Sequence, residues 1–182
     1  MSNRDNIGKH FEDDVRAAFE LFPDVDIVRL IDPQNGYAGV KNICDFLVYR
    51  YPYHYDIECK SCHGDRFPFA NITDNQWKGL SDRRMIKGNN AGIMLWFIDH
   101  DEVCWVPISV IIRRDNSGIK SIRWDDEYIQ KHLIPIRKKR VYVEPDFTSF
   151  FDDYRWSEEE KKKMHEEEGV FYGTNKVRRN RG

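Results

Sequence analysis

A possible β-hairpin constrains this chain more than any other feature of its sequence. Residues 43–50 and 53–60 alternate as strands do, and a Tyr-Pro pair interrupts them midway. If the two runs pair across that break, the numbers of opposed residues sum to 103, so Asp45 faces Glu58. Strand side chains alternate with a period of two, so Lys60 points to the same side as Glu58. This register predicts two carboxylates and one ammonium group on one face of a sheet.

Two opposed carboxylates need a compensating cation. Like charges directly opposite one another destabilise a sheet by a few tenths to about 1 kcal/mol. A divalent metal and the ammonium group of Lys60 are the natural candidates. Mg²⁺ or Mn²⁺ binds hard carboxylate oxygens and keeps waters, one of which can attack a phosphodiester. Lys60 can orient or deprotonate that water, or stabilise the charge that develops on phosphorus. The pattern Asp-x12-Glu-x-Lys therefore indicates metal-dependent phosphodiester hydrolysis.

Composition favours one folded domain. Of the 182 residues, 40% are hydrophobic and 14% aromatic, which is enough for one buried core. We expect a single domain over residues 1–155 and a charged tail over residues 156–182 that is helical or partly disordered. No apolar run has the length of a membrane span, and the first residues lack the apolar core of a signal peptide. These features predict a cytoplasmic protein without a membrane segment.

Hydrophobic spacing predicts helices on either side of these strands. Residues 7–22 carry apolar side chains at helical spacing. Thr73-x-x-Gln76 resembles a capping box and begins a second helix that ends near Gly88, although Gly79 in its middle is unfavourable there. Further strands are expected at residues 26–31, 91–98 and 103–108, and a further helix at residues 125–133. This order of elements predicts an α/β fold in which helices flank a mixed β-sheet.

Cysteine spacing and net charge narrow the possible functions. Cys59 and Cys62 are spaced like half of a zinc site, but no second pair completes it, so we interpret them as structural thiols. The formal net charge is only −2, so any contact with nucleic acid must be local. Any one basic cluster can simply be a solvated face. We single out Arg83, Arg84 and Lys87 as candidate DNA contacts.

Short motifs follow one another along residues 7–151 in a specific order and spacing. They are Gly8-Lys9 with Glu12, Cys44-Asp45-Phe46, Ile57-Glu-Cys-Lys-Ser61, Phe67-Pro-Phe69, Asn75-Gln76, residues 92–98, Lys120-Ser-Ile122 and Pro145-Asp-Phe147. Together they resemble the RecU family of Holliday junction resolvases, a branch of the PD-(D/E)XK nuclease superfamily. The resemblance implies a restriction-endonuclease-like core. Bacterial members have a longer stalk where this chain has only residues 32–41, so the chain is similar to a compact phage-type or otherwise divergent member.

The resemblance also implies an active site. The family's catalytic aspartate, glutamate and lysine match Asp45, Glu58 and Lys60. Its supporting glutamate and glutamine match Glu12 and Gln76. Each of these two has an alternative interpretation, Glu12 as an exposed helix residue and Gln76 as the partner within the capping box alone.

The expected ligands are a metal ion and branched DNA. Asp45, Glu58 and the carbonyl of Cys59 are expected to bind Mg²⁺, for which Mn²⁺ substitutes, and no further small-molecule cofactor is expected. Ser61 is expected to touch phosphate, or else merely to end the strand. Tyr37 is a candidate for stacking on unpaired junction bases, or else a turn tyrosine.

The function implied by the resemblance is resolution of a four-way DNA junction by cuts in paired strands, which leave 5′-phosphate and 3′-hydroxyl ends. Two symmetric cuts require two active sites, so we expect a homodimer. Two alternatives remain open. One is another PD-(D/E)XK endonuclease that acts on linear or damaged duplex DNA, and the other is a non-catalytic module that binds branched DNA.

Overall fold

The computed structural model describes residues 3–30, 42–138 and 143–153, with side chains from residue 7 to residue 151. The chain divides into two compact units, Met1–Phe150 and Phe151–Gly182, and the architecture below is that of the first. No helix among the described residues is long and apolar enough to cross a membrane. The predicted loop at residues 32–39 and the charged tail after residue 155 lie outside the described residues.

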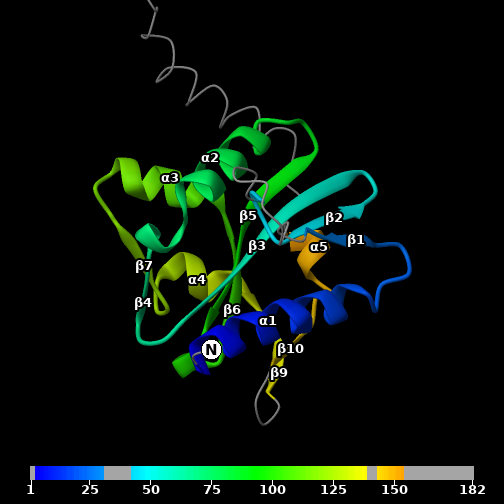
Figure 1. Cartoon of the computed structure of the whole chain (residues 1–182), viewed down its shortest axis with the longest axis horizontal. Coiled ribbons are helices and arrows are strands. Elements are labelled where there is room, and N and C mark those ends of the chain that lie inside the picture. Colours follow the sequence, from blue (N-terminus) through cyan, green and yellow to red (C-terminus); the bar gives the residue numbers. More distant parts are fainter. Residues whose placement is uncertain (1–2, 31–41, 139–142, 154–182) are drawn as a thin grey trace, which may run out of the picture. The chain divides into compact units, whose positions relative to one another are not determined.

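A mixed six-stranded sheet forms the centre of the fold (Figure 1). Its order is β1 (Asp26–Arg29), β2 (Phe46–Arg50), β3 (Tyr53–Cys62), β5 (Asn89–Phe97), β6 (Glu102–Pro107) and β8 (Leu133–Ile134). Only the β3–β5 pair is parallel, and the other neighbours are antiparallel. The predicted α/β fold with a mixed sheet is therefore confirmed.

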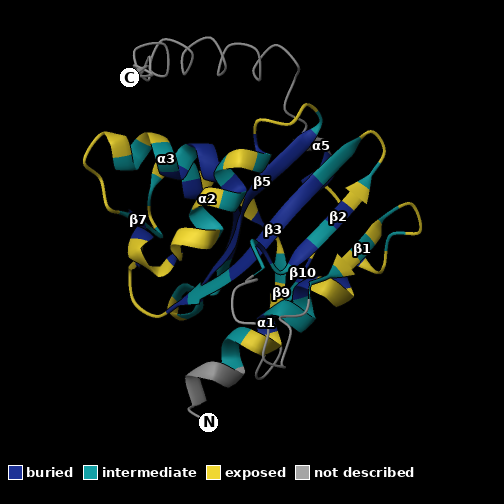
Figure 2. Ribbon diagram, turned by 45° about the horizontal axis from the view of Figure 1, so that its top comes forward, coloured by how far each residue is buried: buried dark blue, intermediate teal, exposed yellow. Residues whose placement is uncertain are grey.

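Strand β5 lies in the middle of this sheet and is buried along its whole length (Figure 2). Its sequence is nearly all apolar, as expected for a strand that is covered on both faces. The edge strand β1 alternates between exposed and half-buried residues instead. Burial thus increases from the β1 edge towards β5, and the β2–β3 hairpin lies between the two.

Helices cover both faces of the sheet. They are α1 (Asn3–Phe19), α2 (Asp74–Arg83), α3 (Ile108–Asn116) and α4 (Glu127–Lys131). The 3₁₀ turns η1 (Phe69–Asn71) and η2 (Ile98–His100) lie in connections, and the short α5 (Phe150–Asp153) begins at the last residue of the first unit. On one face, Phe11 of α1 packs on Trp96 with ring centroids 5.4 Å apart. On the other face, Leu80, Ile111 and Ile129 of α2, α3 and α4 join one core cluster with the strand residues of β5.

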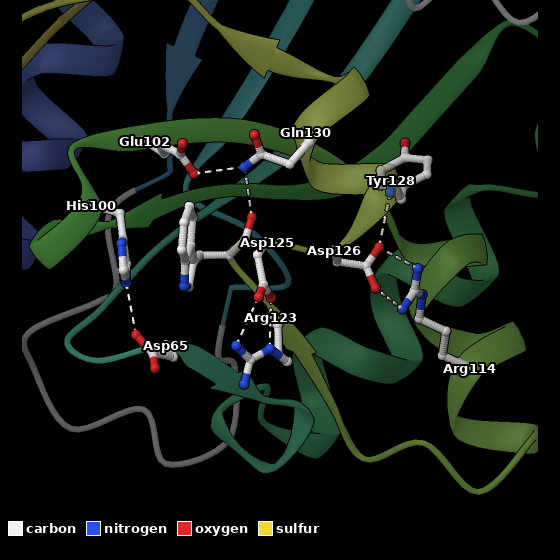
Figure 3. A network of polar contacts seen from close by, with 10 residues as sticks. Asp65, His100, Glu102, Arg114, Arg123, Asp125, Asp126, Tyr128 and Gln130 are labelled. Atoms are coloured by element: carbon white, nitrogen blue, oxygen red, sulfur yellow. Dashed lines mark hydrogen bonds and ion pairs between the residues drawn. The ribbon is translucent and has the colours of Figure 1, made fainter.

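Two small sheets complete the unit. Strand β9 (Ile136–Lys138) pairs with β10 (Val143–Pro145), and β4 (Arg66–Pro68) pairs with β7 (Ser121–Arg123). A polar network surrounds the β4–β7 pair (Figure 3). In it, Arg123 donates to both oxygens of Asp125 at 2.6 and 2.8 Å, and Arg114 donates to both oxygens of Asp126 at 2.7 Å. Both guanidinium groups are therefore already paired with carboxylates.

Some element boundaries differ from the predictions. Strand β2 begins at Phe46 rather than residue 43, because the backbone bends at Ile43 and Asp45, although Asp45 still bonds to both neighbouring segments through Leu30 N and the Ile57 carbonyl. Strand β3 continues to Cys62, two residues beyond the expected end, because it pairs with β5 along its whole length. The first helix ends at Phe19 and the second at Arg83, each earlier than predicted.

Candidate active site

The β2–β3 hairpin has the register that the sequence predicts. Phe46 pairs with Ile57, and each further pair also sums to 103. Asp45 is the next residue beyond this ladder, and its backbone N–H donates to the carbonyl of Ile57 at 3.0 Å. Its carboxylate reaches over β3, where Oδ2 accepts a hydrogen bond from the backbone N–H of Cys59 at 2.7 Å. The carboxyl group of Asp45 is thus fixed beside Glu58.

Glu58 is the centre of the polar contacts at this point of β3. It is buried, with 3% of its surface exposed. Lys60 lies on the same face of the strand, and its Nζ is 2.7 Å from Glu58 Oε1. Gln76 of α2 donates to the same oxygen at 2.5 Å. The structure therefore brings together Asp45, Glu58, Lys60 and Gln76, residues that are up to 31 positions apart in the chain.

Gln76 has both of the roles that the sequence left open. Thr73 caps α2 and accepts a hydrogen bond from the backbone N–H of Gln76 at 3.3 Å. The side-chain Oε1 of Gln76 accepts from the backbone N–H of Thr73 at 3.0 Å, which completes the capping box. The Nε2 end of the same amide remains for Glu58. Capping therefore orients the amide that contacts the candidate active site.

Glu12 approaches from α1 and is held by Arg29 of β1. Arg29 Nη2 donates to Glu12 Oε2, and Arg29 Nη1 donates to Asp13 Oδ1 at 2.9 Å. Arg29 also pairs with Phe46 in the β1–β2 ladder, one residue from Asp45. Arg29 was not among the site residues predicted from the sequence. Its position in the predicted strand at residues 26–31 was the available signal, but the contact with α1 depends on the tertiary fold.

Burial raises the pKa values of Glu58, Asp45 and Glu12, and repulsion by Asp45 raises those of Glu58 and Glu12 further. The pKa of Glu58 rises to about 8, first because the group is buried and then because Asp45 is near, while Lys60 lowers it. Burial also raises the pKa of Asp45, and the hydrogen bond from Cys59 N–H opposes this shift. Burial and Asp45 raise the pKa of Glu12, against the attraction of Arg29. Such a cluster of desolvated carboxyl groups favours the approach of a cation.

The available donors fit Mg²⁺ or Mn²⁺. Among the described residues, no group of three or more His, Cys, Asp and Glu side chains is arranged to hold a metal ion. Asp45 and Glu58 nevertheless offer two adjacent hard carboxylates, and Mg²⁺ is commonly bound by one or two carboxylates while water fills the other positions. Burial raises the pKa of the Cys59 thiol well above its usual value, so only its carbonyl is a suitable ligand. Cys59 and Cys62 point to opposite faces of β3, which argues against a shared zinc ion.

The predicted DNA contacts differ in their surroundings. Arg83 Nε donates to the fully buried Asp56 at 2.5 Å, and Arg84 is itself buried, with 8% of its surface exposed. The guanidinium group of Arg83 is thus already engaged by Asp56, although 34% of its side chain is exposed, and both arginines stay predictions as DNA contacts. Lys87 is exposed and Ser61 is half-buried at the end of β3, so both stay predictions. Tyr37 lies outside the described residues.

The fold and the site together define a class of protein. The mixed sheet with helices on both faces, whose β2–β3 hairpin leads from Asp45 to Glu58 and Lys60, has the restriction-endonuclease-like fold. Comparison with known families is more specific. The RecU family, described as Recombination protein U, matches residues 24–147, more than half of the chain, and the chain belongs to this family. The predicted family is thus confirmed.

Solved structures support the fold. A structure of Archaeoglobus fulgidus Hjc, a Holliday junction resolvase from an archaeal hyperthermophile, matches 69% of this chain and 94% of its own. The TM-score is 0.50 and the sequence identity is 17%, a likeness that concerns the fold alone. A search of curated proteins finds no match.

Proposed function

We propose that this protein is a divalent-metal-dependent endonuclease that resolves four-way DNA junctions. The observation that carries the proposal is the convergence of Asp45, Glu58 and Lys60 on one face of the β2–β3 hairpin, in a chain of the RecU family. The likeness to an archaeal resolvase agrees with it. Residues 1–155 are the nuclease domain in this proposal.

Each residue has a role in hydrolysis of the phosphodiester. Asp45, Glu58 and the Cys59 carbonyl would hold Mg²⁺, which when bound would supply Lewis acidity and lower the pKa of water. Lys60 orients the attacking water and stabilises negative charge on the phosphate oxygens. Water adds to phosphorus, the bond to the 3′ oxygen breaks, and the departing oxygen takes a proton. The products have 5′-phosphate and 3′-hydroxyl ends.

Three other side chains assist the site. Gln76 holds Glu58 by its hydrogen bond, so the carboxylate keeps one orientation. Glu12 adds a further carboxylate at the rim, and Arg29 fixes its position. Ser61, Lys87 and Tyr37 contact the DNA in this proposal, the last by stacking on unpaired bases.

A homodimer is part of the proposal. One domain offers one set of Asp45, Glu58 and Lys60, whereas resolution of a junction needs cuts in two strands. Two copies related by a two-fold axis supply two sites. Sedimentation of the purified protein tests this, and a monomer that resolves junctions in paired cuts would contradict it.

Cleavage of a labelled four-way junction tests the function. Purified protein with Mg²⁺ or Mn²⁺ is expected to cut opposed strands and to leave a linear duplex of the same sequence largely intact. Equal cleavage of both substrates would instead favour a nuclease for linear or damaged duplex. Junction binding without any cleavage would favour a non-catalytic binding module and overturn the proposal.

A further inference from the structure

We propose that Gly79 and Asn75 of α2 are positioning residues that set the distance between the two metal-binding carboxylates. The inference rests on the proposed function and adds two residues that were not assigned to the active site from the sequence. Helix α2 contains an unfavourable residue in its interior. Glycine is unfavourable in a helix interior relative to alanine, yet Gly79 lies in the middle of α2.

Close packing explains the glycine. A Cβ atom built on Gly79 would lie 2.3 Å from Ile43 Cγ2, 2.5 Å from Ile43 Cβ and 3.5 Å from Ile43 Cδ1. The first two distances are shorter than those between non-bonded carbon atoms in proteins, so any side chain at residue 79 would force α2 and Ile43 apart. Gly79 therefore permits a contact between the helix backbone and Ile43 that alanine excludes.

A hydrogen bond one turn earlier holds the same segment. Asn75 Nδ2 donates to the carbonyl of Asn42 at 2.9 Å. Residues 75 and 79 are four positions apart, so they lie on one face of α2. This face contacts Asn42 and Ile43 at two adjacent points. Only Cys44 separates Ile43 from Asp45, and Cys44 is itself buried.

The same helix also holds the second carboxylate. Gln76 contacts Glu58 on β3, while Asn75 and Gly79 contact the segment that leads into Asp45. Helix α2 therefore contacts both the Glu58 side chain and the segment that leads into Asp45, so its position affects the distance between these two acidic residues. A displacement of about 1 Å at a catalytic site can reduce the rate about a hundredfold, so the separation of α2 from Ile43 matters for cleavage.

The main test adds a methyl group to Gly79 and then removes the atoms that it meets. Gly79→Ala should keep junction binding in EDTA and lose about a hundredfold in kcat with little change in KM. Its affinity for Mn²⁺, measured by calorimetry without DNA, should fall about tenfold. Helix propensity alone predicts the opposite, an unchanged or more stable enzyme.

Second-site variants separate positioning from general damage. Ile43→Gly in the Gly79→Ala background removes every clashing atom and should restore Mn²⁺ affinity and most of kcat. Ile43→Ala in the same background should not, because alanine keeps the Cβ that would lie 2.5 Å from the new methyl group. Lys78→Ala, on the exposed side of the same turn, is the control and should behave as wild type.

Three outcomes would overturn the inference. These are wild-type kcat and Mn²⁺ affinity in Gly79→Ala, equal defects in both double variants, or equal rescue by both. If no variant at residue 79 folds, as judged by circular dichroism, Asn75→Asp decides. It is isosteric but cannot donate to Asn42, and wild-type kcat and Mn²⁺ affinity in this variant would also overturn the inference. An inactive wild-type protein would contradict the proposed function only, because Mn²⁺ binding is measured independently.

Discussion

Gln76 and Lys60 share one acceptor, Oε1 of Glu58, at distances of 2.5 and 2.7 Å. One donor comes from α2 and the other from β3, so a neutral amide and an ammonium group converge on a buried carboxylate. These two contacts fix the orientation of the carboxyl group, and with it the direction in which the second oxygen of Glu58 points. This arrangement explains how a carboxyl group with 3% exposure can be oriented for a metal ion.

Removal of the Lys60 ammonium group should abolish cleavage and spare binding. Lys60→Ala is expected to lower kcat by about 10² to 10⁴, the range for a lost acid–base or charge-stabilising group. Its affinity for the junction in EDTA should change little, which gel-shift titration measures. A variant that cleaves at the wild-type rate would show that Lys60 has no part in the reaction.

The stability of the metal-free protein should fall as the pH rises. The pKa of Glu58 rises from 4.5 to about 8 in the folded state, so between these values the folded protein binds a proton that the unfolded chain has lost. The free energy of unfolding then decreases over this range by at most roughly 1.4 kcal/mol per pH unit, and levels off above it. Thermal melts in EDTA measure the effect.

Glu58→Gln is the control for that dependence, because an amide cannot ionise. Its melting temperature should be flatter between about pH 5 and pH 8 than that of the wild type. Mn²⁺ should raise the melting temperature of the wild type most at the higher pH, where the carboxylate is free of protons. If the melting temperatures of both proteins changed with pH in the same way, Glu58 would not be the cause of the pH dependence.

Loss of Arg29 should impair the site through Glu12. Arg29→Met removes the contacts with Glu12 and Asp13, and we expect a loss of about 10- to 100-fold in kcat or metal affinity. Arg29→Lys keeps the charge but cannot bridge both carboxylates, so its defect should be smaller. Arg50→Met breaks the pair with Asp24 and is the matched control at the end of the neighbouring strand β2. Equal effects at both arginines would indicate a merely structural role.

Arg83 should matter for stability rather than for DNA binding. Arg83→Met leaves Asp56, which is fully buried, without its charged partner, and this should cost about 3 to 5 kcal/mol in the free energy of unfolding. Asp56→Asn in the same background should recover part of that loss. Urea denaturation measures both, and a weakened junction affinity at unchanged stability would restore Arg83 as a DNA contact.

The predictions from the sequence were most accurate where the role of a residue depends on its position along a strand. The pairing of residue numbers that sum to 103, and the alternation that puts Lys60 beside Glu58, needed only a turn and a period of two. The capping box of Thr73 and Gln76 is likewise local. The basic pair of Arg83 and Arg84 in the sequence did not indicate that Arg83 contacts a buried acidic residue. The acidic partner of Arg83 lies 27 positions away and is buried by the fold.

The sequence by itself determined the hairpin register, the face that carries the acidic and basic groups, and the family, because periodicity and motif spacing are properties of the chain. Only the tertiary structure decided which charges are neutralised inside the protein. Arg29 contacts Glu12 because α1 packs against β1, and Gly79 lets the side chain of Ile43 lie against the backbone of α2. These contacts join distant segments, and their distances depend on how helices pack on the sheet rather than on any local pattern.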